Sequence, residues 1–501
     1  MATGPGPSAM VSGTAVLWAA AAAVAAFGTW VMYDALPGMN WVLWTGAAAA
    51  GLVAVARSRG AGGRSVLVTG AAATVIAGAA ALTASPVLHL LICASVMVLL
   101  AMQMLLAANP SPRSITARFA VAAPVVAFRK AVTHAIRRGV EATDHIRSTR
   151  ARAWVRGLAI TLPVLVGFAL LLAEADPIFA SWRDHIADLL SIEEFLPRLV
   201  FFTGLLGLVI GAYGYASREY HDTVQTPENA PNRWLGSTER LMLIASVAAL
   251  LWLFLALQLG YLFGTLPSAP SSGMTFAEYA RRGFGELTIV ASASAVLIIL
   301  SERYGQRGGH ERILRILAFV LITAVLLLLG SAFHRVRLYE AAYGYTTARL
   351  YAQAYMTVVA AGLLLLSREV AGELDADRLF RRTAAVATIL FVALIYWNHE
   401  AWIARRNIDR FATTGQLDIA YLTIELSADA IPAIAERLPS LPEPTRSELR
   451  LAVQKHYAAH RDMAEGSWYE WNLARTRAKA VFTTNFASDS GAPPGVTGTR
   501  P

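Results

Sequence analysis

The chain has 501 residues, of which 56% are hydrophobic and only 15% are charged. Soluble domains average about 45–50% apolar and about 25% charged residues, so this composition excludes an ordinary soluble enzyme. The 43 Lys and Arg residues outnumber the 34 acids and give a net charge of +9. These bases lie between apolar runs, and no nucleic-acid-binding motif accompanies them. The sequence therefore predicts a membrane protein that does not bind nucleic acid.

Eleven apolar runs are long enough for membrane helices, since a helix needs about 20 apolar residues to cross a bilayer. They occupy residues 13–33, 39–56, 65–84, 87–108, 157–173, 199–217, 241–264, 284–301, 316–333, 350–366 and 383–397. We expect an all-α, polytopic transmembrane helical bundle of about 11 spans. A tail of residues 1–12 precedes four Ala-rich or apolar helices in 13–108, and seven more helices occupy 157–397.

The single cysteine, Cys93, lies inside an apolar run. One thiol excludes an internal disulfide, a thiolate metal site and a Cys-x-x-Cys motif. The glycines of 65–78 lack the G-x-G-x-x-G spacing of a soluble dinucleotide site, so we expect no cofactor. The first 56 residues contain no Lys or Arg, and the first apolar helix is therefore expected to be retained rather than cleaved as a signal peptide.

The distribution of basic residues predicts the orientation in the membrane, because cytoplasmic loops carry the excess of Lys and Arg. With the N-terminus inside, the inner loops hold 24 bases, the outer loops hold 7, and 12 follow residue 397. We expect a multi-pass protein of the cytoplasmic membrane with a cytoplasmic N-terminus. Residues 398–485 then form a small helical extracytoplasmic domain, and residues 486–501, rich in Gly, Pro, Ser and Thr, form a disordered tail.

Residues 109–156 form the most basic connection and carry apolar side chains such as Val125 and Phe128 between the bases. We expect a cytoplasmic amphipathic helix in 113–156 that lies on anionic lipid. The alternative is a solvated loop that follows the positive-inside rule. A second amphipathic helix is expected at 176–195 on the outer surface, because Asp176 suits an N-cap and Pro177 suits the first helical position.

Polar residues concentrate on the predicted outer face, above all in the expected outer loop 334–349. Arg and Tyr side chains there could bind a carboxylate or a phosphate head group. The alternative is a hydrogen-bonded tie between helix ends and the outer domain. The candidate cluster consists of Asp176, Glu286, Arg335, Arg337, Tyr339, Glu340, Tyr343, Arg349, Asn398, Asn407 and Arg410.

One pair of histidines has metal-ligand spacing. His456 and His460 lie one helical turn apart, and Asp462 or Glu465 could complete a site. Residue 457 is Tyr rather than the Glu of a zinc-protease motif. Exposed helix histidines are the alternative, and we expect no metal site.

Several short motifs resemble those of a known family. They are Ala175–Phe179 (ADPIF), Arg337–Glu340 (RLYE), Asn407–Arg410 (NIDR), Thr414–Asp418 (TGQLD) and Trp471–Arg475 (WNLAR). Across residues 157–480 the chain resembles the bacterial domain-of-unknown-function family 4173 and the related family 4153. The resemblance implies a bacterial polytopic membrane protein and brings no known activity and no catalytic residues.

Three functions remain open from the sequence. The first is a non-enzymatic envelope scaffold or sensor whose domain 398–485 binds a protein partner. The second is a carrier for a solute or lipid with an outer polar entry site. The third is a membrane-embedded transferase, for which Asp176, Glu286 and Glu340 are the available acids. No nucleophile stands beside a base as catalysis requires, and we therefore expect the first function.

Overall fold

The computed structural model of the chain describes residues 7–58, 63–108, 117–144, 161, 192–217, 233–262, 284–306, 308–372, 374–458, 460–463 and 466–486. Within these residues the regular elements are helices, and a lone bridge between Leu235 and Gly305 is the only β-type pairing. The all-α fold class is confirmed. The expected span 157–173, apart from Thr161, and most of the expected helix 176–195 lie outside the described residues.

Six helices share the first apolar core. They are α1 (Pro7–Met32), α2 (Met39–Ser58), α3 (Arg64–Gly78), α4 (Pro86–Ala108), α5 (Ala117–Asp144) and α8 (Ile192–Ala216), and a 3₁₀ turn η1 (Ala79–Ala81) follows α3. Small residues let these helices approach closely. A Cβ atom on Gly211 of α8 would lie 2.0 Å from the carbonyl oxygen of Ala131 in α5, so the backbones of α5 and α8 are in direct contact.

The described part of the basic segment, residues 117–144, forms the helix α5, whose two faces differ. Its alanines at four-residue spacing, Ala123, Ala127 and Ala131, are buried in the core shared with α4 and α8. The exposed apolar side chains of the same helix are Val121, Val125, Phe128 and Ile136. The helix therefore packs on the bundle through its small residues and presents larger apolar side chains to its surroundings.

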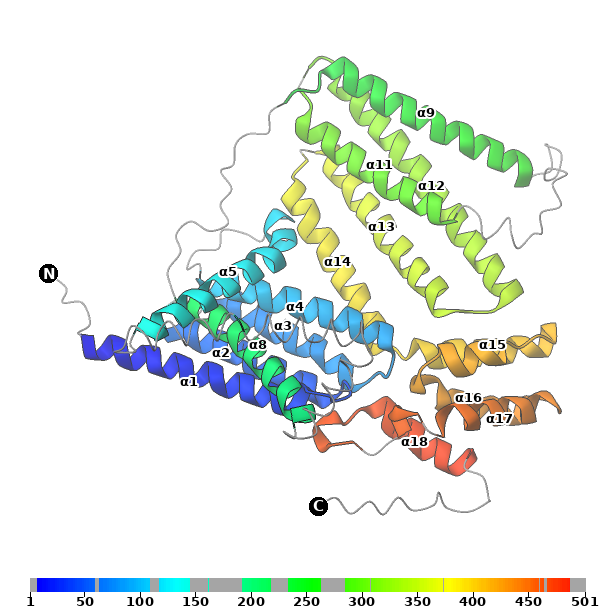
Figure 1. Cartoon of the computed structure of the whole chain (residues 1–501). Coiled ribbons are helices and arrows are strands. Elements are labelled where there is room, and N and C mark those ends of the chain that lie inside the picture. The colour runs from blue at the N-terminus through cyan, green and yellow to red at the C-terminus, as the bar shows by residue number, and fades with distance from the viewer. Residues whose placement is uncertain are drawn as a thin grey trace.

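Five further helices form a second group around α12. They are α9 (Ser237–Leu262), α11 (Phe284–Tyr304), α12 (Glu311–Tyr343), α13 (Thr347–Ala371) and α14 (Ala376–Tyr396). Figure 1 shows that α14 is the helix of this group that lies next to the first group. The contact is specific at one end of α14, where Ile395 packs against α3 and α4 and the Tyr396 hydroxyl donates a 2.6 Å hydrogen bond to the Val75 carbonyl.

Nine of the described helices are long and apolar enough to cross a membrane, and Leu17–Met32 in α1 is a shorter apolar helix. Together they match every expected run except 157–173. The protein is a multi-pass integral membrane protein. One expectation was wrong in detail: the segment expected as the outer loop 334–349 is helical up to Tyr343, because α12 continues for ten residues past its expected end. Only residues 344–346 form the turn before α13.

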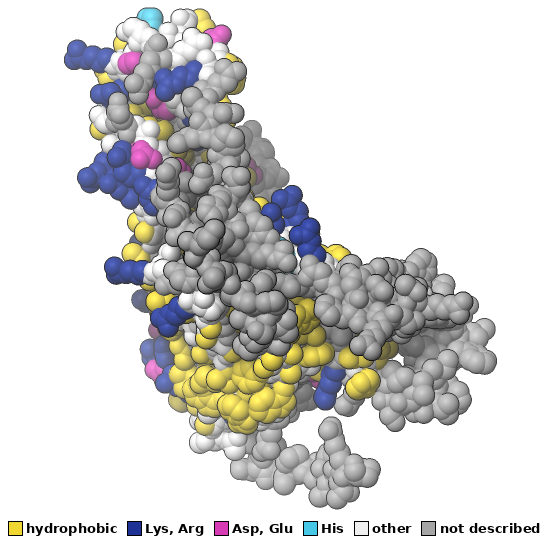
Figure 2. Space-filling model, turned by 90° about the vertical axis from the view of Figure 1, so that its left-hand side faces the viewer, with side chains coloured by type: hydrophobic (Ala, Val, Ile, Leu, Met, Phe, Trp, Pro, Cys, Tyr) yellow, Lys and Arg dark blue, Asp and Glu magenta, His cyan; other side chains and the backbone are white. Residues whose placement is uncertain are grey.

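The end of the bundle opposite the C-terminal domain is rich in basic residues and ion pairs. Arg240, only 1% exposed, contacts Glu302 through Nη2 at 2.6 Å and Glu311 through Nη1 at 3.2 Å, and thereby joins the ends of α9, α11 and α12. Glu369 at the end of α13 accepts hydrogen bonds from Arg378 and Arg382 of α14. Figure 2 shows Lys and Arg side chains spread along this side of the molecule, beside an apolar area.

The C-terminal residues form a compact helical domain at one end of the bundle (Figure 1). Its elements are α15 (His399–Thr414), η2 (Tyr421–Glu425), η3 (Ala428–Ala430), α16 (Ile431–Arg437), η4 (Leu438–Ser440), α17 (Thr445–Tyr457), η5 (Arg461–Met463), η6 (Trp468–Glu470) and α18 (Leu473–Asn485). Helix α15 ends at Gly415, whose φ of 64° is left-handed and whose N–H donates to the Phe411 carbonyl at 2.8 Å. Phe486 is fully buried in the core of this domain, so the described domain runs to that residue.

Candidate functional site

The polar residues that the sequence singles out lie mostly where the C-terminal domain meets the helix bundle. We call this contact the domain junction. It joins the domain to residues 33–38 between α1 and α2, residues 79–85 between α3 and α4, and residues 344–346 between α12 and α13. The chain also enters the domain here, at Trp397. These connections meet at one end of the bundle, as helices that alternate in direction require.

Asn407 of α15 fixes the turn between α12 and α13. Its Oδ1 accepts a hydrogen bond from the Tyr345 N–H at 2.7 Å, and its Nδ2 donates to the Tyr345 carbonyl at 2.9 Å. Arg410 donates from Nη1 to the Ala342 carbonyl at 3.0 Å. Gly344 has a φ of 85°, and a Cβ atom there would lie 2.6 Å from Asn407 Oδ1. Both the backbone conformation and the close approach therefore require glycine.

The last turns of α12 pack their polar groups against the start of α13. The buried Glu340 accepts a 2.6 Å hydrogen bond from Nε2 of Gln353. The Arg349 guanidinium lies 4.2 Å from the Tyr339 ring centroid and donates to the Gly344 carbonyl. Tyr339 stacks on Tyr343 at 4.7 Å. These contacts join α12, α13 and the turn between them.

Other candidates lie apart from this group. Asn398 is at the opposite end of α15, where it accepts from the Ala401 N–H at 2.9 Å and donates to the Asp429 carbonyl at 3.2 Å. Glu286 is exposed in the first turn of α11, and Arg337 is exposed on α12. Arg335 is half-buried on the same helix. Asp176 lies outside the described residues, so the structure leaves this candidate unplaced.

A second polar cluster centres on Asp429 and was missed by the sequence analysis. Asp429 Oδ2 accepts hydrogen bonds from the Thr83 hydroxyl at 2.8 Å, the Ala84 N–H at 2.6 Å and the Ser427 hydroxyl at 3.0 Å. Glu400 Oε2 accepts from the N–H and hydroxyl of Ser427 at 2.6 and 2.7 Å. Both carboxyl groups are buried. The cluster ties η3 and α15 to the turn between α3 and α4.

Burial and the nearby Glu400 carboxylate raise the pKa of Asp429 to about 6. A hydroxyl group carries one proton, so Ser427 cannot donate to both carboxylates at once. Below a pH of about 6, where Asp429 is protonated, it can donate to the Ser427 hydroxyl while Ser427 donates to Glu400.

Neighbouring side chains complete the contact. His399 is buried between the Tyr351 hydroxyl, 2.9 Å from Nε2, and the Trp397 carbonyl, 3.3 Å from Nδ1. Burial lowers the pKa of His399, which favours a neutral ring. Asn472 donates to the carbonyls of Ala80 and Thr83 at 2.8 and 2.7 Å.

Sequence reasoning could have found part of this contact. Asp429 interrupts a run of Ala and Ile residues in Ser427 to Pro432, and this signal points to a polar group held inside the domain. Asn472 and Arg475 belong to the motif Trp471–Arg475 that carried the family resemblance. Arg475 donates from Nη2 to the Pro37 carbonyl at 2.8 Å. Its role depends on a partner 438 residues away in sequence, which no local pattern indicates.

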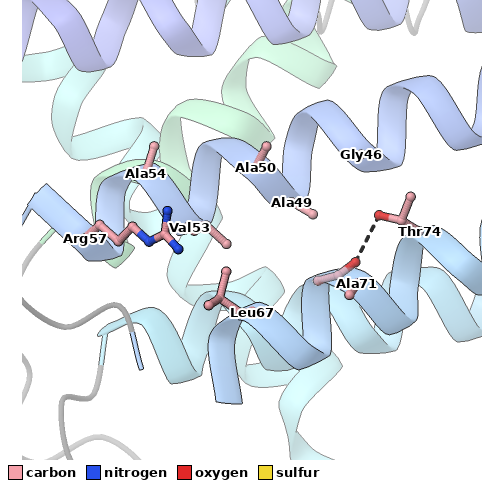
Figure 3. Close-up of a pocket in the computed structure, with 10 residues that line it drawn as sticks. Gly46, Ala49, Ala50, Val53, Ala54, Arg57, Leu67, Ala71 and Thr74 are labelled. Atoms are coloured by element: carbon pink, nitrogen blue, oxygen red, sulfur yellow. Dashed lines mark hydrogen bonds between the residues drawn. The ribbon is translucent and has the colours of Figure 1, made fainter. Parts of the chain in front are cut away.

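Two hollows stand out in the described part of the chain. A groove of about 390 Å³ lies between α2 and α3, as Figure 3 shows, and Arg57 is the one charged residue in its lining. Gly46, Ala50 and Ala54 form one wall, so the groove offers apolar contact and little chemistry. The second hollow, of about 440 Å³, lies at the domain junction beside Trp468 and Trp471.

The histidine pair remains a weak metal candidate. The rings of His456 and His460 have centroids 5.3 Å apart, and His460 Nδ1 lies 3.5 Å from Asp462 Oδ2. Within the described residues, no group of three or more His, Cys, Asp or Glu side chains is placed to hold a metal ion. Glu465 lies outside those residues.

Comparison with protein families shows to which family this chain belongs. A family model described as Domain of unknown function (DUF4153) matches residues 70–437, well over half of the chain. The chain belongs to this family. The DUF4153 region starts within α3 and ends with α16, so it contains Thr83, Glu400 and Asp429 but not Asn472. Of the two related families suggested by the motifs, this is the one shown. Comparison with curated proteins and with solved structures finds no match.

Proposed function

We propose that this DUF4153 protein is a non-enzymatic scaffold or sensor of the bacterial cytoplasmic membrane. Its N-terminus lies in the cytoplasm, and its C-terminal domain lies outside and binds a protein partner. The excess of basic residues in the connections at the end opposite that domain supports this orientation. The motifs that resemble family 4173 fit the same general class of protein. The described structure of α5 also suits contact with anionic inner-leaflet lipid, because Arg129 and Arg137 are exposed near Val125 and Phe128.

The proposal rests on the polar groups at the domain junction, which form hydrogen bonds between the C-terminal domain and the helix bundle. Asn407, Asp429 and Asn472 each bond the backbone or side chain of a helix turn. A transferase needs a nucleophile, a base and a space for substrate between them. Here the buried acids instead face hydrogen-bond donors of the protein itself, which suits a domain held in a fixed position.

The orientation is tested by labelling single cysteines in intact cells. Cys93→Ser gives a cysteine-free background, since the chain has one cysteine. Ser440→Cys places a thiol on the C-terminal domain, and Ser58→Cys places one at the end of α2; both positions are exposed. A membrane-impermeant maleimide should label residue 440 in intact cells and residue 58 only after permeabilisation. The reverse pattern would contradict the proposed orientation.

The non-enzymatic role is tested by complementation of a deletion strain. Arg337→Ala removes an exposed candidate group at no cost to the junction, whereas Asn407→Ala removes two junction hydrogen bonds. We expect Arg337→Ala to complement fully and Asn407→Ala to fail in proportion to the loss of domain docking. Protease protection of the C-terminal domain measures that docking. If Arg337→Ala fails while its domain stays protected, the residue acts in binding or catalysis and the scaffold proposal is wrong.

A further inference from the structure

The hollow of about 440 Å³ at the domain junction is a pocket with one wall from the helix bundle and one from the C-terminal domain. Leu36 and Met39 line it from the bundle, and η6 and α18 line it from the domain. The two sides are joined, because the Met39 N–H donates to the Trp471 carbonyl at 3.0 Å. A Cβ atom on Gly38 would lie 2.6 Å from the carbonyl oxygens of Glu470 and Trp471. The walls are thus in backbone contact beside the pocket.

The pocket lies beside the ends of apolar helices. It is lined by the turn that separates the apolar helices α1 and α2. Two exposed indoles line it, Trp468 at 64% and Trp471 at 42%, and Trp30, which is 57% exposed, lies next to Trp468. Trp30 makes an edge contact with Trp468 at 6.4 Å. Tryptophan is enriched at the height of lipid head groups, so a lipid in the adjacent leaflet can reach this pocket.

The charges of the pocket are of both signs. Asp462 and Glu470 supply carboxylates, and Lys479 supplies an ammonium group on α18. Arg475 is buried, and its Nη2 donates to the carbonyls of Pro37 and Glu470 at 2.8 and 2.7 Å. Its Nη1 lies 3.9 Å from Asp462. Arg475 therefore orients the wall, while the two carboxylates and the lysine define what a ligand meets.

We infer that this pocket binds the head group of a zwitterionic phospholipid with a primary ammonium, such as phosphatidylethanolamine. The ammonium of the lipid donates hydrogen bonds to Asp462 and Glu470 and lies against the indoles, which favour a neighbouring cation. The phosphodiester lies toward Lys479. A purely anionic head group has no ammonium to donate to the two carboxylates, and a choline head group has no N–H donor for them. The inference does not depend on the proposed scaffold or sensor role.

The test uses the full-length protein in nanodiscs made from equal parts of phosphatidylethanolamine, phosphatidylcholine and phosphatidylglycerol. Native mass spectrometry then counts the lipids that remain bound after release from the disc. The wild type should retain phosphatidylethanolamine in preference to the other two lipids. Glu470→Gln and Asp462→Asn should each weaken that retention about tenfold, the effect of losing one charge-assisted hydrogen bond. Glu448→Gln, which removes an exposed acid on α17, is the matched control and should behave as wild type.

Three results would overturn the inference. One is equal retention of phosphatidylethanolamine by the wild type and the pocket variants. Another is equal retention of phosphatidylcholine and phosphatidylethanolamine by the wild type. The third is a rise in melting temperature with soluble phosphoethanolamine in lipid-free detergent that equals the rise with the lipid, which would assign the pocket to a free solute. Lys479→Gln is the second variant if Asp462→Asn unfolds, and it should also reduce retention.

Discussion

The Asp429 carboxylate accepts a hydrogen bond of 2.8 Å from the hydroxyl of Thr83, a residue 346 positions earlier in the chain. This bond joins the C-terminal domain to the turn between two membrane helices. Asp429 is 4% exposed, so water does not compete for the contact. A buried carboxyl group without its donors is costly, and the domain is therefore held against this turn.

The stability of the protein should fall as the pH rises from about 4 to about 6. Asp429 keeps its proton up to a pKa of about 6 in the folded protein, against 3.8 for an ordinary aspartate. The folded state therefore binds more protons than the unfolded state in this window, and the loss amounts to at most about 3 kcal/mol. Asp429→Asn should flatten the dependence of melting temperature on pH. Glu425→Gln, at an exposed acid of the same domain, should leave it unchanged, and an unaltered slope in Asp429→Asn would refute the assignment.

Asn407→Ala should lower the free energy of unfolding by about 2 kcal/mol, because two hydrogen bonds to the backbone of Tyr345 are lost in a buried place. Chemical denaturation in detergent, followed by tryptophan fluorescence, measures the change. Asn485→Ala is the matched control: its amide donates to the Val481 carbonyl on the exposed face of α18, and we expect an effect within about 0.5 kcal/mol. Similar losses in both variants would mean that Asn407 does not hold the turn.

Gly344→Ala and Gly415→Ala form a second matched pair. Both glycines have positive φ, but only Gly344 is crowded, since a Cβ atom on Gly415 meets open space. Gly415→Ala should cost about 1 kcal/mol for backbone strain alone. Gly344→Ala should cost clearly more, because the new methyl group must also displace Asn407. Melting temperatures compare the two variants, and an equal decrease would show that the close approach to Asn407 contributes nothing.

Arg240→Ala should destabilise the group of helices around α12 by about 3 kcal/mol, because Glu302 and Glu311 lose their shared buried partner. Arg312→Ala removes an exposed arginine near the same place and should be close to neutral. The yield of monodisperse protein after mild heating in detergent reports the difference. If both variants aggregate at the same temperature, the Arg240 ion pairs do not stabilise these helix ends.

The membrane helices were predictable from the sequence because their cause is local. An apolar run of about 20 residues must be helical in lipid, where each backbone N–H needs an internal partner. The end of α15 at Gly415 was predictable for a similar reason, since glycine takes the left-handed conformation at low cost. The extension of α12 to Tyr343 was not, because its polar last turns read as a loop and are stabilised by contacts with α13 and α15.

The candidate residues were likewise found from the sequence, whereas their contacts were found only in the structure. The sequence by itself placed Asn407, Arg410 and Glu340 in one polar cluster on the predicted outer face, because hydropathy and the distribution of basic residues define the spans and the loops between them. Only the tertiary structure decided that Asn407 bonds Tyr345, that Asp429 and Asn472 bond the turn at Thr83, and that Trp30 meets Trp468. These partners lie up to several hundred residues apart, and their hydrogen bonds form only after the helices have packed and excluded water from the domain junction.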